Sequence, residues 1–278
     1  VLRRRSAGGI HAGVSGRVPG PVLVTGVAGF IGSNLADRLL AEGARVIGVD
    51  DLSAGVAEQI PEGVEFHRLD IRSPAIEPLF HGVDAVFHLA AKNCIADCQR
   101  DPVETASVNV VGTVRVLEAA RRAGVRRFIY AESSALYEGV TRFPTPESEV
   151  APESFYALSK QAGRLFAGGY ARWAGMRPTA LRYFNVYGPR QDYRRSIPPV
   201  MSAFILALLE GRRSTIYGTG EKRRDFVYVD DVNDFHLLCL EDERTAGGVF
   251  NVGSGESHSV REVFEEVRAR SGSRRSPR

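Results

Sequence analysis

The sequence predicts an α/β protein with a doubly wound parallel sheet and a smaller C-terminal lobe. Short apolar runs alternate with helical patterns from residue 21 to about residue 186, as they do in repeated βαβ units. Beyond residue 186 this rhythm stops. The chain has 278 residues, of which 44% are hydrophobic and 25% are charged, so it can bury a substantial core.

Six apolar runs are expected to form the strands of the sheet. A glycine-rich turn follows the first run and begins the first helix. Two later helical patterns cover residues 102–123 and 155–173. The strand-like runs are residues 22–26, 45–50, 64–70, 84–90, 126–132 and 178–185.

The lobe is expected to hold several separate elements, and a proline-rich segment at 197–199 leads into them. They are an apolar helix that ends at residue 209, a strand over 224–231, a further helix, a strand over 247–254 and a last helix from about residue 259. We therefore expect three regions. Residues 1–20 form a flexible basic extension, 21–186 the sheet domain, to which strand 247–254 returns, and 187–278 the lobe.

Charge and composition exclude several classes of protein. The net charge is +3, but nine arginines lie in end segments without acids, and removing them leaves 27 bases against 33 acids. The body is therefore not expected to bind nucleic acid. No run approaches the roughly 20 apolar residues of a membrane span, and no secretory signal is present, so we expect a cytoplasmic protein. Cys94, Cys98 and Cys239 lack the spacing of a disulfide framework or zinc site, and no metal is expected.

The turn after the first strand has the spacing of a dinucleotide-binding site. Gly26 permits a tight turn, Gly29 lets backbone N–H groups approach a pyrophosphate, and Gly32 allows the helix to pack against the strand. The N-terminus of the helix adds a partial positive charge toward the phosphates. A strand, a glycine turn and a helix in this order predict a Rossmann domain.

Asp50 is expected to select NAD over NADP. It ends the second strand, where a carboxylate accepts hydrogen bonds from the ribose hydroxyls and repels a 2′-phosphate. The alternative is that Asp50 caps a turn. Asp70 and Ile71 follow the third strand, and they either meet the adenine or form a simple strand-to-turn transition.

Tyr156 and Lys160 are the expected reacting pair. They lie one turn apart on the same face of a helix. A tyrosine with a pKa near 10 is a poor base at neutral pH, and a nearby ammonium group and a cationic nicotinamide would stabilise its phenolate. Ser133 ends the fifth strand, where ligands of open α/β sheets bind, and is the candidate that hydrogen-bonds the reacting oxygen. The alternative for Ser133, or for its neighbour Ser134, is a turn former.

These motifs together resemble the extended short-chain dehydrogenase/reductase family. The chain is most similar there to NAD-dependent nucleotide-sugar epimerases of the UDP-hexose 4-epimerase type. The resemblance runs from about residue 21 to 267. It rests on TGxxGFIG, the Asp50 strand end, HLAA (88–91), Asn109 in NVVGT, SSALY, YALSK (156–160), RYFNVYGPRQ (182–191) and RRDFVYVDD (223–231).

The resemblance implies a role for each group of residues, a UDP-sugar substrate and a homodimer built on the helices at 102–123 and 155–173. The implied catalytic residues are Ser133, Tyr156 and Lys160. The implied NAD contacts are Gly26, Gly29, Phe30, Ile31, Gly32, Asp50, Asp70, Ile71, Ala90, Asn109, Tyr156 and Lys160. The implied substrate contacts are Ser133, Asn185, Tyr217 and Arg224. An arginine fork also suits a diphosphate on physical grounds, although Arg223 competes with Arg224 for that role.

The residues after Ser133 favour one reaction of the family. Sugar 4,6-dehydratases place an Asp-Glu pair there, decarboxylases a Glu and the epimerase-reductases a Cys, whereas this chain has Ser134 and Ala135. We therefore expect 4-epimerisation of a UDP-hexose through a transient 4-keto sugar. A dehydrogenase or reductase of the same family and a non-catalytic NAD-binding protein are the alternatives.

The chain also departs from the family pattern. Glu132 replaces a small or hydroxyl residue, and Glu138 replaces a common glycine. Either residue is expected to alter the substrate pocket, and the alternative for Glu132 is a solvent-facing position on the strand. Relatives continue past the last helix, so the substrate lobe is expected to be curtailed.

Overall fold

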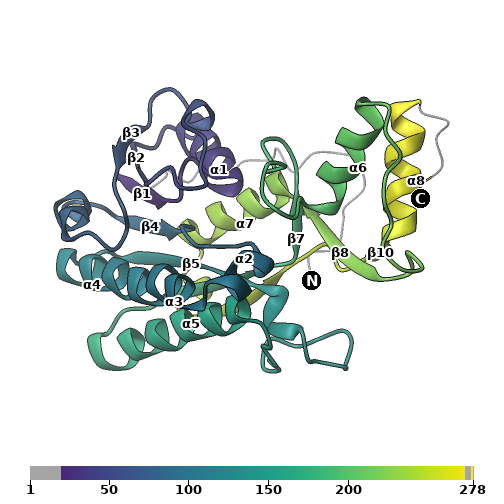
Figure 1. The fold of residues 1–278 in the computed structure, drawn as a ribbon. Helices are drawn as coiled ribbons and strands as arrows, with labels where there is room; N and C mark the ends of the chain where they lie inside the picture. The colour runs from purple at the N-terminus through teal and green to yellow at the C-terminus, as the bar shows by residue number, and fades with distance from the viewer. Residues whose placement is uncertain (1–19, 273–276, 278) are drawn as a thin grey trace.

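Seven parallel strands form the main sheet of this computed structural model, which describes residues 20–272 and residue 277 (Figure 1). Their order is β3-β2-β1-β4-β5-β6-β9. The strands are β1 (Val22–Thr25), β2 (Val46–Asp50), β3 (Glu65–Arg68), β4 (Ala85–His88), β5 (Arg127–Ser133), β6 (Thr179–Tyr183) and β9 (Val249–Val252). The order reverses between β1 and β4, as in doubly wound sheets, so the predicted fold class is confirmed. Apart from Gly20, the predicted extension over 1–20 lies outside the described residues.

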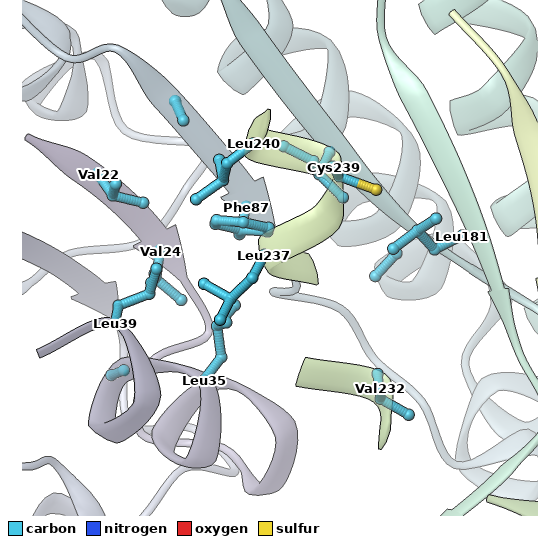
Figure 2. Close-up of a cluster of buried hydrophobic side chains, with 14 of the residues drawn as sticks. Val22, Val24, Leu35, Leu39, Phe87, Leu181, Val232, Leu237, Cys239 and Leu240 are labelled. Atoms are coloured by element: carbon cyan, nitrogen blue, oxygen red, sulfur yellow. The ribbon is translucent and has the colours of Figure 1, made fainter. Parts of the chain in front are cut away.

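Helices cover both faces of this sheet (Figure 1). On one face, Leu35 and Leu39 of α1 and Leu237 of α7 pack with Val22 and Val24 of β1 (Figure 2). On the other face lie α4 and α5, which share a second apolar core with alternate strand residues such as Leu23 and Tyr130. The helices are α1 (Phe30–Ala41), α2 (Ile95–Arg100), α3 (Pro102–Ala106), α4 (Thr113–Ala123), α5 (Phe155–Ala174) and α7 (Val229–Glu241).

Short turns of helix join several of these elements. One of them, η3 (Ser107–Gly112), is a π-helix between α3 and α4, so the predicted helix over 102–123 is divided into three segments. The 3₁₀ turns are η1 (Ala57–Gln59), η2 (Pro74–Phe80), η4 (Ser134–Tyr137) and η5 (Glu243–Thr245).

The lobe is built on a three-stranded sheet in the order β10-β8-β7. Its strands are β7 (Asn185–Tyr187), β8 (Arg223–Tyr228) and β10 (Ser257–Ser259). Two further helices, α6 (Val200–Leu209) and α8 (Val260–Ser271), pack against each other. The rings of Phe204 and Phe264 meet there edge to face at 5.3 Å.

The C-terminal part also contributes to the main sheet. Strand β9 pairs with β6, so the run predicted over 247–254 lies at the edge of that sheet. The strand predicted over 224–231 is too long, because β8 ends at Tyr228 and α7 begins at Val229. Asp230 and Asp231 lie in the first turn of α7, where the helix dipole favours negative charge. None of the helices in the described residues is long and apolar enough to cross a membrane.

Candidate active site

The glycine turn between β1 and α1 has the shape that a dinucleotide requires. Gly26 has a φ of 75°, and a Cβ atom there would lie 2.8 Å from the backbone nitrogen of Ala90. A Cβ atom on Gly32 would overlap the carbonyl oxygen of Gly26. No side chain caps the start of α1 at Gly29, so the first N–H groups of the helix, at Phe30 and Ile31, are available for an anion. The cradle therefore fits a pyrophosphate.

Asp50 stabilises this turn through hydrogen bonds. Its carboxylate accepts hydrogen bonds from the N–H groups of Ala28 at 3.0 Å and Leu52 at 2.9 Å. Burial raises the pKa of Asp50, and the two backbone N–H groups oppose this rise. Asp50 thus caps this turn, and its contact with the ribose stays a prediction, for which the carboxylate keeps further lone pairs.

Asp70 and Ile71 lie in a turn rather than at the strand end, because β3 stops at Arg68. The Arg72 guanidinium forms an ion pair with the Asp70 carboxylate at 2.6 Å. The hydrogen bonds between the two side chains lower the pKa of Asp70. Ile71 is buried against Gly112. The strand-to-turn interpretation therefore describes the geometry of both residues.

Asn109 connects the segment after β4 to α5. Its amide accepts a hydrogen bond from the Lys92 N–H at 2.8 Å, and donates to the Lys92 carbonyl at 3.0 Å and to the Ser159 hydroxyl at 2.9 Å. Ser159 in turn donates to the Tyr156 carbonyl at 2.7 Å. Sequence reasoning missed Ser159, whose signal was its place three residues after Tyr156 in YALSK. Asn109 thus positions the helix that carries the expected reacting pair.

The three expected catalytic residues lie together at the end of β5 and the start of α5. The Ser133 hydroxyl accepts a hydrogen bond from the Ala135 N–H at 3.2 Å. Burial raises the pKa of Tyr156, and a hydrogen bond with Ser133 opposes this rise. The side chain of Lys160 is buried, with its Nζ 5.0 Å from the centre of the Tyr130 ring. Burial lowers the pKa of Lys160 to about 8, while the charge of Glu132 opposes this decrease.

The expected substrate residues occupy the lobe. Asn185 of β7 pairs with Phe226 of β8, close to Arg224, and its amide donates to the Asp225 carbonyl at 2.8 Å. Arg223 forms an ion pair with Glu262 at 3.2 Å and donates a hydrogen bond to the Ser257 hydroxyl at 3.0 Å, so its guanidinium is engaged within the lobe. Arg224 is exposed, and its one hydrogen bond among the described residues goes to the Arg223 carbonyl at 2.8 Å. Tyr217 is 91% exposed in the segment before β8.

The structure shows the surroundings of Glu138 and Glu132, the two residues that depart from the family pattern. Glu138 accepts hydrogen bonds from the Ser154 N–H at 2.7 Å and hydroxyl at 2.8 Å, and so anchors the start of α5. The solvent-facing alternative for Glu132 is wrong. Its side chain is fully buried and forms an ion pair with Arg182, because β6 places that guanidinium directly opposite on the sheet.

Comparisons with known proteins agree with this geometry. The model of the NAD dependent epimerase/dehydratase family matches residues 22–253. The UDP-glucose 4-epimerase of Mycolicibacterium smegmatis is 41% identical over 256 residues, which cover 88% of this chain and 80% of that protein.

Solved structures show the same similarity. The UDP-glucose 4-epimerase of Thermotoga maritima, crystallised with UDP-glucose, is 38% identical with a TM-score of 0.89, over 92% of this chain and 84% of that one. The Thermus thermophilus UDP-glucose 4-epimerase in complex with NAD is 36% identical with a TM-score of 0.85, over 92% and 84% of the two chains.

Relatives with other reactions are also similar. A UDP-glucuronic acid decarboxylase from Arabidopsis thaliana is 32% identical over 95% of this chain and 62% of that protein. The extent of the family match and the glycine cradle that suits its cofactor lead to one conclusion: the chain belongs to the NAD-dependent epimerase/dehydratase family.

Proposed function

We propose that the chain catalyses the 4-epimerisation of a UDP-hexose through a transient 4-keto sugar. The observation that carries this proposal is the placement of Ser133 at the end of β5 and of Tyr156 in the first turn of α5, with Lys160 one helical turn further along. A base, a hydroxyl that binds the reacting oxygen and a cation that stabilises the base are the groups needed to remove a proton from a sugar hydroxyl.

In this mechanism Tyr156 accepts the proton of the C4 hydroxyl, and Ser133 hydrogen-bonds the same oxygen. The Lys160 ammonium stabilises the Tyr156 phenolate through its charge. The residues that would hold NAD are those of the glycine cradle, with Asp50 at the ribose. When bound, NAD supplies the acceptance and return of the C4 hydride. Tyr156 returns its proton when the sugar is reduced on its other face.

The segment after Ser133 favours epimerisation over elimination or decarboxylation. Ser134 and Ala135 begin η4, and neither side chain is an acid or base that works near neutral pH. Asn185 and Arg224, on neighbouring strands of the lobe, are the proposed contacts of the nucleotide diphosphate. An exposed guanidinium suits a diphosphate through two parallel hydrogen bonds.

Proton NMR of the purified protein incubated with UDP-glucose tests the proposal. We expect UDP-galactose to appear with no net release of reduced nicotinamide, because the hydride returns to the sugar. Release of free NADH would instead identify a dehydrogenase. Bound NAD without any change in UDP-hexoses would identify a non-catalytic NAD-binding protein.

We also propose that two copies of the chain associate through α5. One face of this helix presents an exposed apolar stripe, here called the α5 stripe, which consists of Phe155, Leu158, Leu165, Phe166 and Trp173. Trp173 is the most exposed of these side chains, at 84%. Apolar stripes of this size are typical of surfaces that pair with a second copy.

A further inference from the structure

The strand that presents Ser133 also carries a buried carboxylate one residue earlier. The Glu132 side chain has no exposed surface, and its Oε2 lies 2.5 Å from the Nε of Arg182, a residue that is only 1% exposed. Its other oxygen, Oε1, lies 3.1 Å from the Nε of Arg164 on α5. One buried carboxylate therefore lies against two guanidinium groups, of which Arg182 is buried and Arg164 is partly exposed.

Arg182 is fixed by more than this ion pair. Its Nη1 donates hydrogen bonds to the Tyr137 hydroxyl at 2.8 Å and to the Glu147 carbonyl at 2.7 Å. Tyr137 in turn donates to the Asn251 side chain at 2.6 Å. The guanidinium therefore stays in place if Glu132 loses its charge, and its positive charge would then be uncompensated.

This group of charges lies beside Lys160. Tyr130 and Glu132 are two residues apart on β5, so both side chains face α5. Lys160 and Arg164 are one turn apart on the face of α5 that meets them. The Tyr130 hydroxyl donates to the Lys160 carbonyl at 3.1 Å, which fixes this turn against the strand. The ionisable side chains that face this region are His88 from β4, Cys98 from α2, Tyr130 and Glu132 from β5, Tyr137 from η4, Tyr156, Lys160 and Arg164 from α5, and Arg182 from β6.

Glu132 is the carboxylate in this group. With its charge, the sum over Glu132, Lys160, Arg164 and Arg182 is two positive charges, and without it the sum is three. Each added positive charge makes a buried ammonium harder to keep. Burial alone already lowers the pKa of Lys160, and the Glu132 charge acts against this.

We propose that Glu132 is a positioning residue for catalysis: it offsets Arg164 and Arg182, and so keeps Lys160 in its ammonium form beside Tyr156. The proposal rests on the proposed function of Tyr156 and Lys160. It also explains how the chain tolerates a carboxylate next to Ser133, since the position is internal and paired with Arg182.

The three lysines of the chain, Lys92, Lys160 and Lys222, allow a direct test. Lysine isotope-labelled at its ε-carbon gives one NMR signal per residue, and the variants Lys92→Arg and Lys222→Arg assign the other two. In the full chain we expect Lys160 to titrate at about 8. Glu132→Gln keeps the shape of the side chain and removes its charge, so the midpoint should fall by about one pH unit or more.

Charge-compensating variants separate electrostatics from packing. Arg164→Gln should raise the Lys160 midpoint, and the double variant Glu132→Gln/Arg164→Gln should return it toward the wild-type value. Glu243→Gln is the matched control, because Glu243 pairs with the buried Arg127 at the opposite end of β5, at 2.9 Å. It should leave the Lys160 midpoint unchanged.

Each outcome has a distinct meaning. An unchanged midpoint in Glu132→Gln, or a double variant that titrates like the single one, would overturn the proposal. If Glu132→Gln does not fold, an unchanged midpoint in Arg164→Gln overturns it equally. Variants that shift as expected in a protein that does not interconvert UDP-hexoses would support the role of Glu132 and remove the proposed function. If the protein interconverts UDP-hexoses but the Lys160 midpoint does not move in the variants, the proposed function would stand and the role of Glu132 would be rejected.

Discussion

Tyr156 is the residue on which the proposed chemistry depends. It lies in the first turn of α5, half-buried, and burial raises the pKa of its phenol. A phenol in this state is a poor base until a cation stabilises its anion. A hydrogen bond with Ser133 opposes this rise, and we propose that the ammonium of Lys160, one turn further along α5, stabilises the anion.

Replacing Tyr156 with Phe should abolish most of the turnover and leave NAD binding intact. The variant removes the proton acceptor alone, so we expect kcat to fall by about 100- to 10,000-fold. Steady-state kinetics and the NAD content of the purified protein measure the two effects. Tyr170→Phe is the control, since this tyrosine lies on the same helix and donates to Glu118 at 3.1 Å. Near-normal turnover in Tyr156→Phe would reject the assignment.

At this scale, the sequence predicts residues whose role depends on local spacing. The glycines of the turn are predicted by their spacing within one motif, and Tyr156 and Lys160 by their spacing within another. The buried position of Glu132 could not be predicted, because its ion-pair partner Arg182 lies fifty residues further along the chain. Strand β6 brings Arg182 to the neighbouring position of the sheet. A charged residue in a strand has no local signal that separates a buried ion pair from a solvent-facing side chain.

The role of the glycine turn can be tested by a substitution at the contact between β1 and α1. A Cβ on Gly32 would meet the backbone of Gly26, which cannot move aside without shifting the strand. We expect Gly32→Ala to lower the free energy of unfolding by about 1–3 kcal/mol and to weaken NAD binding. Urea unfolding and NAD titration measure these effects.

Gly168→Ala is the matched control for this helix packing. Gly168 lies in the interior of α5 with no atom within 4 Å of the added carbon. Because alanine has the higher helix propensity, we expect the unfolding free energy to rise by about 0.5–1 kcal/mol. Equal effects of the two variants would show that the Gly32 contact does not matter.

The α5 stripe makes a prediction about assembly. Trp173→Glu places a charge within the proposed interface, at the C-terminal end of the α5 stripe, so we expect a dimer to become a monomer in sedimentation experiments. Because Trp173 is the single tryptophan of the chain, its fluorescence in the unmodified protein should shift to longer wavelength upon dilution. A wild-type monomer at all concentrations would exclude the interface.

Element boundaries show where sequence patterns stop being informative. The central strands β1, β2 and β4 were predictable because they are short, mostly apolar runs buried on both faces. The β8–α7 boundary was not, because Val227, Tyr228 and Val229 favour an extended chain on both sides of it. Packing of α7 against α1 and the main sheet decides where the helix begins.

Two buried histidines should make the whole molecule sensitive to acid. His88 contacts Thr25 and Thr113 at 2.8 and 2.9 Å, and His236 contacts Tyr183 at 2.6 Å. Burial lowers the pKa of each from 6.5 to about 3. The unfolded chain therefore binds two more protons than the folded one between these values. Stability is full above pH 6.5 and is lost as pH falls, by about 1.4 kcal/mol per pH unit for each histidine.

Urea unfolding at several pH values measures this slope. His236→Gln should remove about half of the histidine contribution. His81→Gln, at an exposed position after η2, should leave the slope as in the wild type. A slope that His236→Gln does not change would show that carboxylates alone account for acid unfolding.

The position of β9 has a consequence during synthesis. Leu181 of β6 pairs with Phe250, so the exposed edge of the sheet is completed by residues that leave the ribosome almost seventy positions later. Until then the nascent chain presents an unpaired strand to its surroundings, and such edges promote association between chains. Ribosome-bound chains that stop before residue 249 should consequently need a chaperone, whereas those that extend past residue 252 can close the sheet themselves.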